Sequence, residues 1–153
     1  MAHSHIPKKE HLMAGKSFAF ATIAGGITLF VLGYVFYELL LSGFFENNLT
    51  DAGRAVMLAE PKVLGIFLSN LVYATLLTLT VGTWAKASSA GEGFKVGATV
   101  GLLFALSVDI AFQSFTNIWT LNAAFVDTLM NAIMGGIAGA VIAVVVGKTS
   151  TSV

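Results

Sequence analysis

Four long apolar segments constrain this chain more than any other feature of its sequence. A helix needs about 20 mostly apolar residues to cross the hydrocarbon core of a bilayer, and in lipid the backbone has to satisfy its own hydrogen bonds. The segments therefore predict an all-α fold with four transmembrane helices in an antiparallel bundle. We expect these spans at about residues 17–41, 63–85, 95–116 and 122–146.

The composition excludes several classes of protein. Hydrophobic residue types make up 56% of the chain and charged types 10%, with a mean hydropathy of +0.85, whereas average soluble domains carry about 25% charged residues. Such a chain cannot cover a water-facing surface, which excludes an ordinary soluble enzyme and a disordered protein. Eight basic residues balance eight acidic residues, so no basic field exists to attract nucleic acid. The lipid bilayer is the predicted partner.

The distribution of Lys and Arg predicts how the single membrane domain, residues 1–153, is oriented. Short loops rich in these residues stay on the cytoplasmic side. Both termini should therefore be cytoplasmic, with tails at residues 1–16 and 147–153, in a multi-pass protein of the cell membrane. Arg54 and Lys62 fall on the other side, against Lys8, Lys9, Lys16, Lys86, Lys95 and Lys148 on the cytoplasmic side. Trp84 at the inner end, with Tyr37 and Trp119 near the outer end, fits aromatic anchoring at the two interfaces.

The loops carry two local predictions. Residues 88–93, SSAGEG, are expected to form a flexible inner loop. In the long outer loop, either Thr50 or Asp51 can cap a short helix, DAGRAVMLAE, that stops at Pro61.

Small residues recur at every fourth position in the third and fourth spans. Membrane helices associate through close packing at such positions, because lipid solvates large apolar side chains as well as a neighbouring helix does. These stripes are interpreted as packing faces inside one bundle, and the alternatives are a dimer interface or a pocket. The glycines concerned are Gly97, Gly101, Gly135 and Gly139.

Polar residues continue the same two stripes. In the third span the series extends to Asp109 and Gln113, and in the fourth it begins with Asp127 and Asn131. Residues four apart share a helix face. These side chains should therefore project into the bundle and not toward lipid.

The depths of the polar residues predict one cluster in the outer half of the membrane. Folding the last two spans about the turn between them places Asp109 at a depth between Asp127 and Asn131. Glu38 from the first span and Asn70 from the second reach the same half. All four helices thus contribute a polar group.

The two aspartates have an energetic consequence. A carboxylate near the membrane centre costs about 2.5–3.5 kcal/mol on insertion scales, and the spans supply no Lys or Arg to pair with it. Arg54, in the outer loop, can fold over the cluster as a lid; otherwise Asp109 and Asp127 share protons.

Because desolvation and a neighbouring like charge both favour the neutral form of a carboxyl group, we expect at least one of Asp109 and Asp127 to be protonated at neutral pH. An infrared titration of the carboxyl bands checks this prediction. Finding both groups ionised already below about pH 5 would contradict it.

Two functional interpretations stay open. The cluster can bind or translocate a proton, a cation or a small polar ligand, since ionisable residues inside membranes are functional candidates. Alternatively, the cluster is a hydrogen-bonded network that only fixes helix register, and the protein is an accessory or scaffold subunit of a larger membrane complex held by Gly-rich helix packing. Asp127 can also cap the fourth span, and Glu38 can be solvated or paired with Arg54. A homo-oligomer fits the small size of the chain.

No cofactor, metal site or enzymatic activity is predicted. His3, His5 and His11 lie in the N-terminal tail without further ligands nearby, and the chain has no cysteine. Serines in the spans have no histidine base within the membrane, so a hydrolase triad has no support.

Three stretches carry a resemblance to a known family. They are VLGYVFYELL in the first span, GATVGLLFALSVDIAF in the third and FVDTLMNAIMGGIAGAVI in the fourth. Here the chain resembles an uncharacterised bacterial family of small four-helix membrane proteins, known as a domain of unknown function. The resemblance implies a four-helix fold and a bacterial inner membrane location, and it implies no activity.

Overall fold

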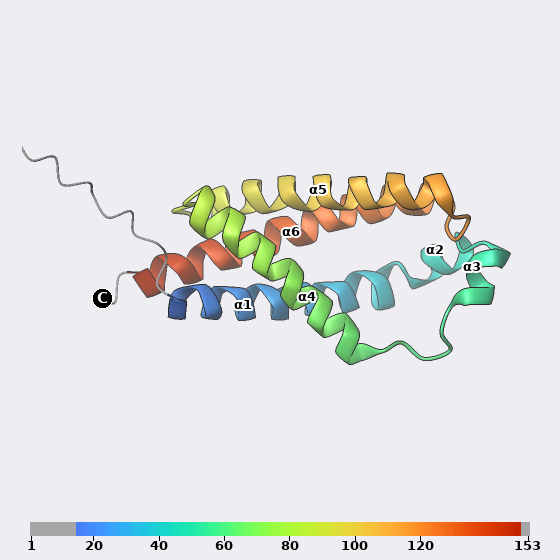
Figure 1. Cartoon of the computed structure of the whole chain (residues 1–153), viewed down its shortest axis with the longest axis horizontal. Coiled ribbons are helices and arrows are strands. Elements are labelled where there is room, and N and C mark those ends of the chain that lie inside the picture. The colour runs from blue at the N-terminus through green and yellow to red at the C-terminus, as the bar shows by residue number, and fades with distance from the viewer. Residues whose placement is uncertain (1–14, 151–153) are drawn as a thin grey trace, which may run out of the picture.

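The computed structural model describes residues 15–150, and the predicted all-helical fold is confirmed (Figure 1). Four of its helical segments are long and apolar enough to cross a membrane. The histidines of the N-terminal tail lie outside the described residues. The long segments are α1 (Gly15–Gly33) with η1 (Tyr34–Leu40), α4 (Val63–Leu77) with η2 (Thr78–Trp84), α5 (Ala90–Phe115) and α6 (Leu121–Ser150), and two short helices, α2 (Ser42–Asn47) and α3 (Asp51–Val56), lie between the first two.

The first two spans end in π-helical segments, η1 and η2. At the end of η1 the Leu41 amide donates to the Phe36 carbonyl at 2.8 Å, and at the end of η2 the Ala85 amide donates to the Thr80 carbonyl at 2.8 Å. Each bond joins residues five apart, which widens the helical turn. Both spans lack proline, as expected, so these wide turns are what changes the direction of their side chains.

The prediction of a loop over residues 88–93 is wrong for residues 90–93, which form the first turn of α5. Ser89 caps the helix, because its hydroxyl accepts from the Glu92 amide at 3.2 Å. The Glu92 carboxylate in turn accepts from the Ser88 amide at 2.7 Å and the Ser88 hydroxyl at 2.9 Å. This reciprocal arrangement closely resembles a capping box and explains why the helix begins earlier than its apolar residues do.

The loop between the first two spans contains the expected short helix, but α3 ends at Val56 and does not reach Pro61. Thr50 caps it by accepting from the Gly53 amide at 3.0 Å. Residues 48–50 also pair with the turn between α5 and α6: the Thr50 amide donates to the Ile118 carbonyl at 3.0 Å, and the Thr120 amide donates to the Asn48 carbonyl at 3.0 Å. The loop is thereby fastened to the 116–120 end of the bundle.

Helices α5 and α6 lie side by side, α1 runs along α6, and α4 crosses the bundle diagonally (Figure 1). Short α2 and α3 gather at the end where α5 turns into α6. The core is small, because only a few large side chains are fully buried. The largest of them are Leu29, Leu77, Ile142, Val81 and Thr78.

The predicted packing faces of α5 and α6 are confirmed, and they face each other within the chain. A Cβ atom added at Gly97 would overlap the Gly135 carbonyl, and one at Gly101 would overlap the Asn131 carbonyl. We call this close contact between α5 and α6 the glycine seam. At its other end, a Cβ atom at Gly139 would overlap the Gly93 carbonyl. Only glycine permits backbones to approach this closely.

Candidate functional site

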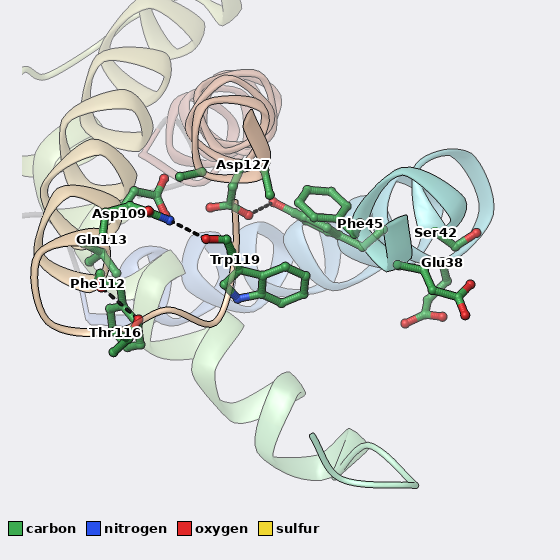
Figure 2. A pocket seen from close by; sticks show the side chains of 14 residues that line it. Glu38, Ser42, Phe45, Asp109, Phe112, Gln113, Thr116, Trp119 and Asp127 are labelled. Carbon is green, nitrogen blue, oxygen red and sulfur yellow. Dashed lines mark hydrogen bonds between the residues drawn. The ribbon is translucent and has the colours of Figure 1, made fainter. Parts of the chain in front are cut away.

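A cavity of about 520 Å³ opens at the 116–120 end of the bundle, and we call it the acidic cavity. Helices α5 and α6 form one side of it, and η1 and α2 form the other (Figure 2). Asp109 and Gln113 of α5 and Asp127 of α6 point into it. The glycine seam ends just before this level, so the close contact between α5 and α6 gives way to a polar space.

Asp127 is held by a triad of side chains. Tyr37 Oη donates to Asp127 Oδ1 at 2.7 Å, and Asn131 Nδ2 donates to Asp127 Oδ2 at 2.9 Å. Asn131 Nδ2 also lies 3.2 Å from Tyr37 Oη and donates to it. Both oxygens of the carboxyl group therefore accept a hydrogen bond, and the triad ties η1 to α6.

Asp109 has only one of its two oxygens engaged. The Thr128 hydroxyl donates to Asp109 Oδ2 at 2.6 Å, and Thr128 is buried. No other residue between 15 and 150 makes a hydrogen bond to Oδ1. This oxygen is thus available to a ligand that enters the acidic cavity.

The cavity is bordered by the turn between α5 and α6, which Gln113 holds in place. Gln113 Nε2 donates to the Trp119 carbonyl at 3.1 Å (Figure 2). This bond leaves the indole of Trp119 as part of the cavity wall. Gln113 is therefore a positioning residue for the wall as well as a lining residue.

Three aromatic rings form the wall opposite Asp109, with Phe45 in contact with each of the other two. The rings of Tyr37 and Phe45 lie 5.1 Å apart between centroids, and those of Phe45 and Trp119 lie 5.9 Å apart in an edge-to-face arrangement. We call these three residues the aromatic wall. Polarised ring faces beside carboxyl groups form a surface that suits positive charge.

The ionisable side chains that line the cavity are mostly acidic. Its lining contains four carboxyl residues and no Lys, Arg or His, with Glu38 and Glu46 added to the two aspartates. Glu38 points away from the aspartates, toward the rim (Figure 2). Arg54 Nη2 donates to the backbone carbonyl of Glu46 at 2.6 Å, so the structure places its guanidinium outside the cavity lining and not over the aspartates.

Of the six predicted site residues, the structure brings four together, places a fifth at the rim of the cavity and separates the sixth from them. Asp109, Asp127, Asn131 and Gln113 lie at or beside the cavity, and Glu38 lies at its rim. Asn70 does not join them: its amide donates to the Ile66 carbonyl of its own helix at 2.9 Å, since α4 diverges from the bundle toward its N-terminal end (Figure 1).

The alternative role of Asp127 as a helix cap does not fit the structure. Helix α6 begins at Leu121, and Thr120 caps it, with its hydroxyl accepting from the Ala123 amide at 3.3 Å. Asp127 lies in the second turn, where its carboxyl group bonds other side chains. Its contacts are those of a cluster residue.

Two residues of the candidate site, Tyr37 and Thr128, were not predicted as part of it from the sequence. Tyr37 was predicted only as an aromatic anchor at the membrane surface, yet its hydroxyl bonds Asp127. Its position in η1, where the turn is wider than in an α-helix, turns it toward α6. Thr128 lies outside the every-fourth series, and its position directly after Asp127 was the only sign in the sequence that it could belong to the site.

Replacing Tyr37 with Phe is expected to lower the stability of the protein. The change removes hydrogen bonds to Asp127 and Asn131 and keeps the ring contact with Phe45. Interhelical bonds in membranes average about 0.6 kcal/mol, so we expect a loss of about 1 kcal/mol in the free energy of unfolding.

Unfolding in detergent micelles measures this change. Tyr34→Phe is the matched control, because Tyr34 lies in the same π-helical segment and is 56% exposed. Equal stabilities of the two variants would contradict the role of the Tyr37 hydroxyl.

No group of three or more His, Cys, Asp or Glu side chains that could hold a metal ion occurs between residues 15 and 150. The chemistry that the site offers is that of carboxyl groups in a partly enclosed space. They can bind a proton or balance a positive charge.

No protein-family model, curated protein or solved structure matches this chain. The resemblance to a bacterial family of four-helix membrane proteins therefore stays an expectation.

Proposed function

We propose that this protein is an antiparallel four-helix membrane bundle that binds or translocates a proton, a cation or a small polar ligand at Asp109 and Asp127. In this proposal both termini face the cytoplasm and the acidic cavity opens to the outside. The positions of the charged loops support this orientation. Lys86 precedes α5 at the end opposite the cavity, whereas Arg54 lies in α3 at the cavity end.

One observation carries the proposal: two carboxyl groups from adjacent helices point into one cavity that no basic side chain lines. A register-fixing network would satisfy its polar atoms internally, as Asp127 does with Tyr37 and Asn131. Asp109 departs from this pattern, because Oδ1 faces the cavity without a hydrogen bond from the described residues. A positive ligand or a proton bound at Oδ1 would supply the missing interaction of this carboxyl group.

The accessory or scaffold subunit is the second candidate, and it was predicted from the glycine stripes. Those glycines are used within the chain, where Gly97 and Gly101 pack against α6. Their packing faces are therefore already covered within one subunit and do not require a partner protein. The acidic cavity, in contrast, is not explained by helix packing.

A flux assay in proteoliposomes tests the proposed function. Wild-type protein should carry protons or small cations across the liposome membrane, and Asp109→Asn should not. Equal flux through both proteins would contradict the role of Asp109, and flux no greater than that of protein-free liposomes would contradict translocation.

A further inference from the structure

A second hollow lies on the other side of the α5–α6 pair, with a volume of about 730 Å³. We call it the apolar groove, because Asp109 is its only charged lining residue. Its walls come from α5 and α6, with one ring from α2. Apolar side chains make up most of the lining, and they include Leu106, Ile110, Leu121 and Phe125.

The acidic cavity and the apolar groove meet at Asp109. Three residues, Asp109, Gln113 and Ala124, line both of them. Asp127 lines only the cavity, and Thr128, whose hydroxyl bonds Asp109, lines only the groove. Asp109 therefore lies at the boundary between an acidic, aromatic space and an apolar one.

The chemistry of the two spaces differs in a way that selects a class of ligand. Carboxyl groups without basic partners favour a positive charge, and the aromatic wall of Tyr37, Phe45 and Trp119 favours a cation that is weakly hydrated. The groove has seven apolar lining residues, and its polar ones are Asp109, Gln113, Ser114, Asn122 and Thr128. It suits a hydrocarbon chain.

We infer that the ligand is an amphiphilic organic cation. Its positive head lies in the acidic cavity between the two aspartates and the aromatic wall, and its apolar tail lies in the groove. This inference rests on the proposed function and names the class of ligand for the same site. Because Leu121 and Phe125 are largely exposed on the outer face of the bundle, such a ligand would enter sideways from the bilayer.

N-hexylpyridinium provides a direct probe, since pyridinium rings quench tryptophan fluorescence. The experiment uses full-length protein in phosphatidylcholine nanodiscs with the substitution Trp84→Phe. Trp84 is 69% exposed, far from the cavity in sequence, and its removal leaves Trp119 as the only tryptophan. We expect saturable quenching of Trp119, with binding weakened about tenfold or more by Asp109→Asn.

The tail is tested by shortening it. N-methylpyridinium should bind at least about tenfold more weakly than N-hexylpyridinium, since each buried methylene group strengthens binding several-fold. Phe125→Ala, in the groove, should remove most of this difference. Phe115→Ala is the matched control, because Phe115 is 70% exposed and lines neither space.

Three results would overturn the inference. They are quenching that does not saturate, equal binding of the two pyridinium ions, and equal effects of Phe125→Ala and Phe115→Ala. Any of these, together with an Asp109-dependent flux of protons or inorganic cations in proteoliposomes, would leave the proposed function standing and restrict its ligand to a small ion. If pyridinium binding fails in one of these ways and the flux does not depend on Asp109 either, the proposed function is refuted as well.

Discussion

A leucine in place of Gly97 is expected to prevent α5 and α6 from packing. Even one carbon atom at this position would overlap the Gly135 carbonyl, and a Cβ atom would also lie 3.0 Å from the Cα atom of Gly139. Backbone atoms cannot rotate away as a side chain does, so the helices have to separate. We expect the free energy of unfolding to fall by about 3 kcal/mol or more, which is the upper end of the range for overpacking.

The stability of this variant can be measured by unfolding in detergent micelles, with helix content as the signal. Gly91→Leu is the matched control on the same helix, because a Cβ atom there meets nothing within 4 Å. That variant should retain wild-type stability. Two equally stable variants would show that the seam between α5 and α6 is not packed as described.

The second large effect is expected from Asp109→Asn in proteoliposomes. An asparagine can still accept the Thr128 hydrogen bond that Asp109 Oδ2 accepts, so the fold should persist. It cannot hold a negative charge, nor release a proton in the accessible pH range. Flux driven by a proton or cation gradient should therefore fall to the level of protein-free liposomes.

Three further variants make this test specific. Asp51→Asn changes an exposed carboxyl group in α3 and should leave the flux unchanged. Asp127→Asn should reduce it, because Asp127 lines the same cavity. Glu38→Gln should have a smaller effect, since Glu38 lies at the rim. Flux that falls equally in all variants would point to a general loss of folded protein, and flux that persists in Asp109→Asn would refute the role of that residue.

The sequence was sufficient for the four spans and for the packing faces of α5 and α6. A spacing of four residues is reliable where a helix is regular and straight, as both of these helices are. It placed Gly97 and Gly101 against α6, and it placed Asp109 and Asp127 on the inward face. Helix length and glycine spacing both follow from the bilayer and from close backbone packing, so they can be read without a structure.

Other parts of the site could not be predicted, because they depend on deviations from the regular helix. The wide turn of η1 changes the direction of Tyr37, and no spacing rule for α-helices anticipates it. The prediction that Asn70 joins the cluster was wrong for a related reason. It assumed that α4 runs alongside its neighbours, whereas α4 crosses them diagonally (Figure 1). Phe45 belongs to a short helix that the sequence does not mark.

The start of α5 shows a different limit. Residues 90–93 are Ala, Gly, Glu and Gly, and their composition is typical of a loop. The hydrogen bonds between Ser88, Ser89 and Glu92 nevertheless begin a helix there. Capping interactions depend on a few polar atoms, so they outweigh composition over a single turn.

A structure of the protein in a lipid nanodisc, with the density around Asp109 resolved, would show directly where the two carboxyl groups point. We predict that the carboxyl groups of Asp109 and Asp127 both face one space and that ordered water or a bound molecule contacts Asp109 Oδ1 within it. The account would be contradicted if either carboxyl group pointed into the acyl chains, or if tightly packed apolar side chains filled the space between them.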